Sequence, residues 1–258
     1  MTPDCLETLV KTLDENTDCD LCQCKLSYID ENSVPLPEDQ QWSVRASKYL
    51  HDLLDRPHKR YAPHDGVLHF ALMVYTSLTQ LLIRKQLFDN IGYFKTGWGS
   101  MADFEWGMRA SLLYNTVYVP KVLATWRKHP FQATNDAYSS KKRPTILKMT
   151  RHAFDFALQH DREKVKTISY SELSLSYKKE TIHQEISHIK GLNLKISYFF
   201  TCLVKQPSVT LLYVIDRFFN RKWRDKNRSM NWVTEMMKKY NIVRPIVIYH
   251  KHKLSNYI

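Results

Sequence analysis

Apolar residues stand at helical spacing at the start of the chain and then change to strand spacing. The spacing i, i+3, i+4, i+7 predicts a helix over residues 2–13, with a buried stripe of Leu6, Leu9, Val10 and Leu13. From residue 21 to residue 29 the period becomes two, and the apolar face is made by Cys22, Cys24, Leu26 and Tyr28. We therefore predict a half-buried strand after the first helix.

Short apolar runs follow in the middle of the chain. Residues 67–74 form an apolar-rich run that predicts a strand, and residues 81–84 predict a second, shorter strand. A short helix is expected from Leu87 to Ile91, ended by Gly92, because glycine readily adopts the backbone conformation that ends a helix.

A further helix is predicted after the glycine-flanked loop at residues 97–100. Its apolar face is made by Phe104, Met108 and Leu112. Ser100 or Asp103 can cap its first turn. Residues 117–119 then predict a short strand, closed by Pro120.

Beyond residue 134 the chain becomes basic and reads as helical. The expected helices cover about 145–160, 180–190, 195–205, 207–223 and 230–240. Residues 1–135 carry a net charge of −2, whereas residues 136–258 carry +14. Such asymmetry predicts two regions with different partners, one of them anionic.

The composition excludes several classes of protein. Among 258 residues, 43% are hydrophobic and 12% aromatic, which excludes a disordered chain. The longest uncharged apolar-rich run, at residues 196–204, is far shorter than the ~20 residues that span a bilayer. Five cysteines, an odd number, and no export signal predict free thiols in a cytoplasmic protein. Six glycines are few for a complete nucleotide-binding α/β enzyme.

Residues 81–134 contain a series of motifs in a specific order. They are Leu82-Ile83-Arg84-Lys85, Phe88-Asp89-Asn90-Ile91-Gly92-Tyr93-Phe94, Ala102-Asp103-Phe104-Glu105-Trp106 with Arg109, Tyr118-Val119-Pro120, and Thr125-Trp126-Arg127-Lys128-His129 followed by Gln132-Ala133-Thr134. This order resembles the second half of family 2 glycosyltransferases, enzymes of the GT-A fold that move a sugar from a nucleotide-sugar donor. The segment Pro3-Asp4-Cys5-Leu6-Glu7-Thr8-Leu9, with Ile29-Asp30-Glu31 after the predicted strand, resembles the family segment just downstream of its metal-binding Asp-x-Asp motif.

The resemblance implies an α/β fold. Residues 1–135 would be the acceptor-side half of an incomplete GT-A, Rossmann-like domain, and residues 136–258 a basic, mostly helical extension. The nucleotide-binding half with its Asp-x-Asp motif is expected to be missing, so the chain is expected to be a fragment that is inactive alone. The intact family enzyme uses a divalent metal, Mn²⁺ or Mg²⁺, and surface polysaccharide assembly is the expected process. The alternative is a non-catalytic remnant or binding module.

Asp103 is the expected catalytic residue. An inverting sugar transfer needs a base for the proton of the attacking hydroxyl, and a carboxylate at a helix start can be held near that hydroxyl. In the family this position carries the base. The competing interpretation is a plain helix cap.

Other positions are expected to serve substrate or metal. Trp98 and Trp106 offer flat apolar faces for a sugar ring, although core packing explains them equally well. Arg109 can meet an anionic group or pair with Glu105 at i, i+4. The resemblance gives His129 a role at the metal or the diphosphate, with a solvated loop histidine as the alternative.

Two other metal interpretations are weaker. The motif Asp18-Cys19-Asp20 follows the first helix, whereas the family's Asp-x-Asp motif precedes it, so an acidic turn is the simpler explanation. Cys5, Cys19, Cys22 and Cys24 lack the second ligand pair that structural zinc sites usually show.

The basic extension predicts an anionic partner. Residues 207–228 pass from an apolar-rich helix into a basic cluster, which suits an anionic membrane surface on the inner face of the membrane. A packed helix with a solvated basic end is the alternative. Nucleic acid is not expected, because the chain contains no nucleic-acid-binding motif.

Overall fold

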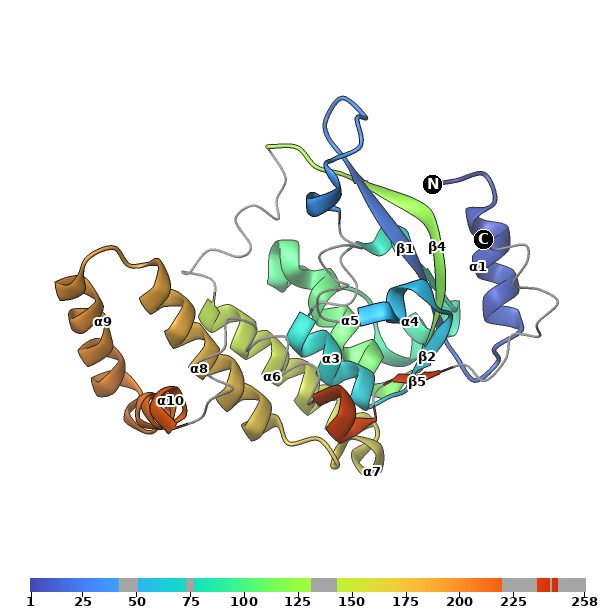
Figure 1. The fold of residues 1–258 in the computed structure, drawn as a ribbon. Helices are drawn as coiled ribbons and strands as arrows, with labels where there is room; N and C mark the ends of the chain where they lie inside the picture. Colours follow the sequence, from blue (N-terminus) through green and yellow to red (C-terminus); the bar gives the residue numbers. More distant parts are fainter. Residues whose placement is uncertain (42–50, 73–76, 131–142, 220–235, 242, 246–258) are drawn as a thin grey trace. The chain divides into compact units, whose positions relative to one another are not determined.

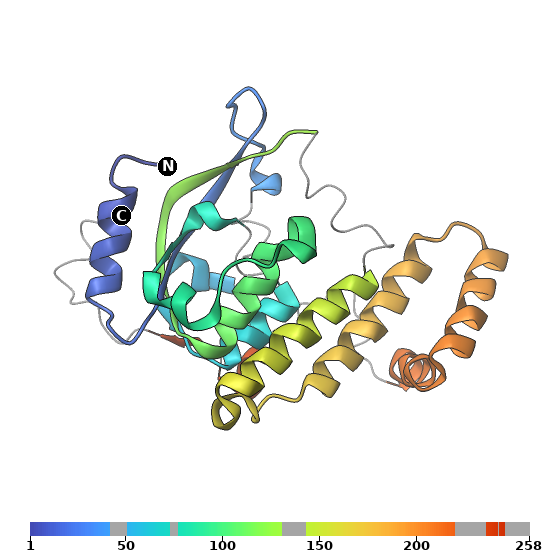
Figure 2. The same cartoon turned by 180° about the vertical axis from the view of Figure 1, so that it is seen from behind.

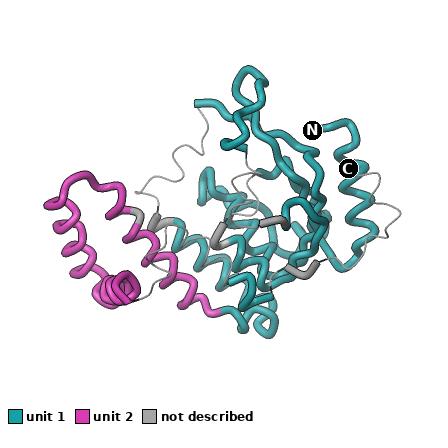
Figure 3. Tube along the Cα trace, in the orientation of Figure 1, with its two compact units in different colours: residues 1–168, 233–258 teal, residues 169–232 magenta. Residues whose placement is uncertain are grey.

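The fold is described from a computed structural model of the chain. The residues that it describes are 1–41, 51–72, 77–130, 143–219, 236–241 and 243–245. The chain divides into two compact units, shown in Figure 3. Unit 1 comprises residues 1–168 and 233–258, and unit 2 comprises residues 169–232. The boundary expected at residue 135 is therefore not where these units divide.

Unit 1 is built around an open mixed sheet of five strands in the order β3-β1-β4-β2-β5. The strands are β1 (Leu21–Ile29), β2 (His58–Arg60), β3 (Leu81–Ile83), β4 (Thr116–Arg127) and β5 (Val243–Pro245). The central pair β1 and β4 is parallel, and every other pair is antiparallel. The expectation of an α/β chain is confirmed at this level.

Helices cover both faces of the sheet. They are α1 (Cys5–Asp14), α3 (His64–Leu72), α4 (Lys85–Ile91), α5 (Ala102–Leu113), α6 (Arg143–His160) and α7 (Arg162–Val165). Figures 1 and 2 show α1 on one face, whereas α3, α5 and α6 lie on the other. Between the layers lie fully buried side chains such as Leu21, Leu26 and Trp106. This burial is the main stabilising contribution to unit 1.

Several predicted elements are confirmed. They include α1, β1, β3, α5 and α6. Helix α4 ends as expected, because Gly92 adopts a positive φ of 77° directly after Ile91. Helical structure at residues 236–240 confirms the described part of the helix expected over 230–240.

The strand predicted over residues 67–74 is wrong, because residues 64–72 form α3. Residues 65–69 are all buried, so this stretch of the helix shows no alternation of buried and exposed positions that would reveal its period. Gly66 allows close packing on α5, since a Cβ there would lie 2.4 Å from a methyl carbon of Leu112. An apolar run of this length does not distinguish a buried helix from a buried strand.

Three local predictions also need correction. Pro120 does not close a strand, because β4 continues through it with a register shift against β1 between Cys24 and Lys25. The buried side of α1 includes Cys5 and Thr12 with Leu9 and Leu13, while Leu6 and Val10 are exposed. Neither Ser100 nor Asp103 caps α5, whose first turn begins after Met101.

Unit 2 contains three helices in its described part: α8 (Tyr170–His188), α9 (Leu192–Lys205) and α10 (Pro207–Phe219). Its core is made by Ile182, Cys202 and Tyr213, one from each helix. A search of the described residues finds no helix with the length and apolar character needed to cross a membrane. The basic residues 220–228 lie outside the described part of the chain.

Candidate functional site

Asp103 stands in the first turn of α5 as an exposed residue. Its Oδ1 accepts a hydrogen bond of 2.8 Å from the N–H of Phe104. Desolvation by the surrounding protein raises the pKa of its carboxyl above the ordinary value of 3.8, against the smaller lowering effect of the backbone N–H groups. Asp103 therefore combines access to solvent with a stronger basicity than a plain surface aspartate has.

The 3-10 segment Thr96–Met101, here called the Trp98 loop, leads into α5. Gly99 has a positive φ of 57°, a conformation that glycine adopts without strain. Trp98 is half-buried and packs against a cluster of Met101, Phe104 and Met149. The Trp98 loop is thus fixed by contacts with α5 and α6 directly beside Asp103.

Trp106 is a core residue and not a wall of a binding site. Its side chain is fully buried, and its Nε1 donates a 2.8 Å hydrogen bond to the carbonyl of Gly92. The ring stacks on Phe88 and meets Phe94 edge to face. Because neither face is open, the substrate-binding role predicted for Trp106 is replaced by packing.

Arg109 is also buried, and its guanidinium is used within the protein. It makes two hydrogen bonds, of 2.8 and 3.0 Å, with the carboxylate of Glu105. Its remaining N–H groups donate to the carbonyls of Ile91 and Tyr93. The ion pair that the sequence analysis gave as the alternative is thus present, and Arg109 is not available to an anionic substrate.

A polar chain extends from Glu105 to the surface. His152 of α6, about one-third exposed, places Nδ1 2.9 Å from Oε1 of Glu105. The Nε2 of His152 lies 2.8 Å from Nζ of Lys95, and the imidazole lies beside Trp98 with ring centroids 5.8 Å apart. A neutral imidazole that donates from Nδ1 and accepts at Nε2 satisfies both contacts.

His129 lies just after the end of β4 and is exposed. The preceding residue, Lys128, places its ammonium 4.0 Å from the ring centroid of Tyr28. Arg127 ties the end of β4 to the turn after β1, since it donates to the carbonyls of Asp30 and Glu31. Two cations therefore precede His129, and both are engaged with residues of β1 or the turn that follows it.

Helix α5 and strand β4 run in opposite directions, and His129 follows the end of β4. Helix α5 leads into β4 after a turn of two residues, so its first turn lies toward the carboxyl end of β4. Ligands of open α/β sheets bind outside the carboxyl ends of the strands. The Trp98 loop and Asp103 are neighbours at the start of α5, whereas no contact joins them to His129 among the described residues.

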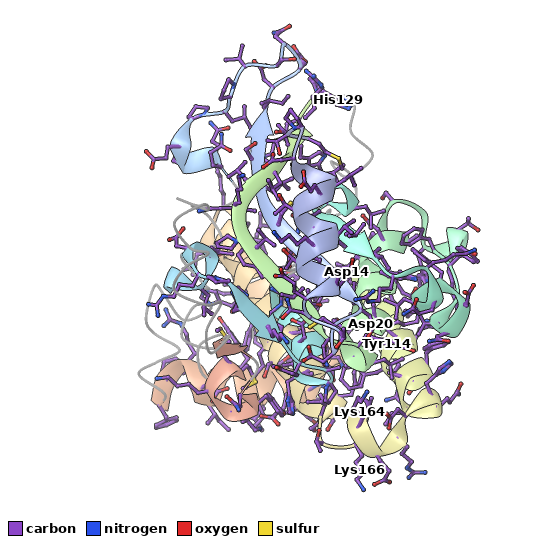
Figure 4. The ribbon with its side chains drawn as sticks, turned by 90° about the vertical axis from the view of Figure 1, so that its right-hand side faces the viewer. Asp14, Asp20, Tyr114, His129, Lys164 and Lys166 are labelled. Carbon is purple, nitrogen blue, oxygen red and sulfur yellow. The ribbon has the colours of Figure 1, made fainter. Side chains whose placement is uncertain are left out.

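The described residues do not form a metal site by themselves. No group of three His, Cys, Asp or Glu side chains among them could hold a metal ion. Figure 4 shows His129 at one end of unit 1 and Asp20 well away from it, near Tyr114. Asp18 pairs with Lys59 at 2.5 Å. The metal role of His129 stays a prediction, and no step is derived through a metal.

The cysteines are free and buried throughout. Burial raises the pKa of the Cys19 and Cys24 thiols to about 12. Since a thiol must lose its proton to act as a nucleophile or metal ligand, these cysteines behave as small apolar core residues.

Sequence reasoning missed Lys95 and His152. Lys95 carried no distinguishing signal, and His152 stood in a region assigned to the basic extension. Only the packing of α6 on α5 brings it to Glu105. For Glu105, the sequence offered one signal: it stands four residues before Arg109, the spacing of a helical ion pair.

Comparison of the chain with family models, with curated proteins and with solved structures found no match. The resemblance to family 2 glycosyltransferases therefore remains a prediction that depends on the motifs and on the site geometry.

Proposed function

We propose that this chain forms the acceptor side of a glycosyltransferase site. In this proposal unit 1 is the incomplete GT-A domain, and the reaction moves a sugar from a nucleotide-sugar to a saccharide or lipid-linked acceptor. The observation that carries the proposal is the exposed Asp103, with its raised pKa, in the first turn of α5 beside the Trp98 loop. The order of motifs along residues 81–134 supports it.

Asp103 would act as the general base. The acceptor oxygen forms a bond to the sugar's anomeric carbon while the bond from that carbon to the diphosphate breaks, and the hydroxyl proton passes to Asp103. With Oδ1 held by the N–H of Phe104, Oδ2 can take this proton. A carboxylate with a raised pKa is the stronger base, which favours proton transfer near neutral pH.

The other residues would position the reactants. Trp98 would offer the uncovered part of its ring to the apolar face of the acceptor sugar. His129, with the cations Arg127 and Lys128 beside it, would face the diphosphate of the donor. A divalent metal, where the nucleotide-binding half is present, would neutralise charge on the departing diphosphate.

A binding module without catalysis is the second candidate. It is favoured by the burial of Trp106 and Arg109, because two of the side chains expected at the substrate are used for packing. The two candidates differ in what Asp103 does: a binding module needs no base.

Asp103→Asn distinguishes them. The chain would be assayed alone and fused in frame to a nucleotide-binding half that ends in Asp-x-Asp, with UDP-, GDP- and dTDP-sugars, Mn²⁺ and saccharide acceptors. We expect acceptor-dependent release of nucleoside diphosphate from the fused protein. Asp103→Asn should lower it by ~10²–10⁴-fold, the usual contribution of a general base.

Asp14→Asn is the matched control, because Asp14 is an exposed aspartate of α1 on the opposite face of the sheet. It should release nucleoside diphosphate at the wild-type rate. Near-normal release by Asp103→Asn would remove the catalytic role of Asp103, whereas no acceptor-dependent release from the fused wild-type protein would favour the binding module.

A further inference from the structure

Unit 2 exposes an unusual amount of apolar surface on α9 and α10. Of 18 large hydrophobic side chains exposed among the described residues, 11 lie between residues 192 and 219. They are Leu192, Leu194, Ile196, Phe200, Leu203, Val204, Leu211, Leu212, Ile215, Phe218 and Phe219. Val204 is 81% exposed and Phe219 is 82% exposed, so water covers nearly the whole of these side chains. Patches of this kind mark interaction surfaces.

The exposed side chains of α9 form a stripe opposite to the core of unit 2. Leu192, Ile196, Phe200 and Val204 follow one another at four-residue spacing and therefore share one face of the helix. The core face of α9 carries Cys202, with Tyr198 packed against that core. At 100° per residue, these two positions lie on the other side of the helix from the stripe.

Helix α10 repeats this pattern. Leu211, Ile215 and Phe219 stand at four-residue spacing, whereas Thr210 and Tyr213 face inward. Both helices are thus apolar on the side that packs and on the side that faces solvent. A helix that is apolar all round is normally buried, so we expect a binding partner to shield this second face from water.

The charged residues in and next to these two helices indicate what kind of partner would bind the apolar stripes. From residue 189 to residue 219 the chain contains four basic residues, Lys190, Lys195, Lys205 and Arg217, and one acidic residue. That acidic residue, Asp216, is paired with Lys179 of α8. The next residues, 220–232, add five basic residues and one acidic residue in sequence. An apolar face whose helices carry and adjoin basic residues in the sequence complements the acyl chains and headgroups of an anionic lipid surface.

The dimensions suit helices that lie in a membrane interface. The 14 residues of α9 span about 21 Å at 1.5 Å per residue, less than the hydrocarbon core of a bilayer. Pro207, the first residue of α10, follows soon after α9 and prevents the two helices from forming one longer helix. Two short helices with exposed apolar stripes and flanking lysines match the pattern of interfacial anchors.

We propose that α9 and α10 form an interfacial membrane anchor, in which the stripes at 192–204 and 211–219 enter an anionic bilayer surface. The sequence pattern pointed only to residues 207–228, whereas the structure brings in α9 as an equal contributor. The proposal is independent of sugar transfer by unit 1, since it involves none of the residues around Asp103.

Vesicle co-sedimentation tests the proposal on the full chain. The probes are vesicles of equal parts phosphatidylserine and phosphatidylcholine, and vesicles of phosphatidylcholine alone. Wild-type protein should pellet with the anionic vesicles and be released from them by salt, because screening shortens the reach of the basic residues. A four-site variant, Ile196→Ser, Phe200→Ser, Ile215→Ser and Phe219→Ser, should bind at least tenfold more weakly.

The matched control replaces four exposed apolar residues of unit 1: Leu6→Ser, Val10→Ser, Val34→Ser and Val122→Ser. This variant should bind like the wild type. Equal pelleting of the two four-site variants, or no pelleting of the wild type, would overturn the proposal. A second copy of the chain is the other partner that could bind the stripes, and light scattering in lipid-free buffer tests for it. A dimer of the wild type that the α9–α10 variant fails to form would assign the stripes to a second copy and overturn the membrane anchor.

Discussion

At the scale of single residues, the environment of a side chain decides between roles that the sequence leaves equal. Trp98 and Trp106 were equivalent in sequence, but only Trp98 retains exposed surface. Arg109 is committed to Glu105 by two hydrogen bonds. Asp103 has the opposite character, because its carboxyl is exposed and carries a raised pKa. Such a perturbed group at the surface is a reason to expect chemistry there.

Two buried histidines make unit 1 sensitive to acid. Burial lowers the pKa of His58 and of His69 to about 3, whereas an unfolded histidine titrates near 6.5. Below pH 6.5 the unfolded chain therefore binds protons that the folded chain does not, and stability is lost as the pH falls toward 3. Each histidine adds a slope of up to ~1.4 kcal/mol per pH unit to the free energy of unfolding.

Urea unfolding followed by tryptophan fluorescence at pH 7, 6 and 5 measures this loss. His58→Gln keeps a donor for the carbonyl of Arg56, which His58 contacts at 3.0 Å, but removes one titrating group. The slope of stability against pH should fall by about the amount of one histidine. An unchanged slope would show that His58 is not held neutral in the folded protein.

At the scale of elements, the sequence predicted the helices and strands that bury only one face or that end at a recognisable residue such as glycine. Helix α4 was predicted because Gly92 marks its end, and β1 because its apolar residues alternate. Helix α3 was missed because residues 65–69 are all buried, which removes the periodic signal. The pairing of Glu105 with His152 was out of reach, since it depends on a packing angle between α5 and α6 that local pattern does not specify.

The buried ion pair between β2 and α3 is expected to hold these elements together. Arg60 donates from Nε to Oδ1 of Asp65 at 2.7 Å, and both side chains are almost fully buried. Thr116 of β4 donates to the other carboxylate oxygen. Asp65→Asn should lower the free energy of unfolding by ~3–5 kcal/mol, because the charge of Arg60 then stays buried without its partner.

Asp155→Asn is the control, since it breaks an exposed pair with Arg151 that should contribute at most about 1 kcal/mol. Urea unfolding of both variants compares the two pairs. The double variant Arg60→Met, Asp65→Leu should lose less stability than the sum of its single changes. Equal small losses for Asp65→Asn and Asp155→Asn would contradict a stabilising role for the buried pair.

At the scale of the whole molecule, the two compact units differ in surface chemistry. Unit 1 holds the sheet and Asp103, and unit 2 exposes the apolar stripes of α9 and α10. The charge asymmetry in the sequence indicated two regions with different partners, yet α6 belongs with the sheet although its sequence is part of the basic half. Sequence charge is informative about partners and says little about which helix packs where.

The central claim is that Asp103 is a proton acceptor and not a helix cap. Carboxyl-carbon NMR of the intact chain, labelled on aspartate and assigned with Asp103→Asn, measures the pKa of this residue directly. Desolvation predicts a midpoint above the ordinary 3.8. A midpoint at or below that value, as the helix N-terminus alone would produce, would contradict the account and return Asp103 to a structural role.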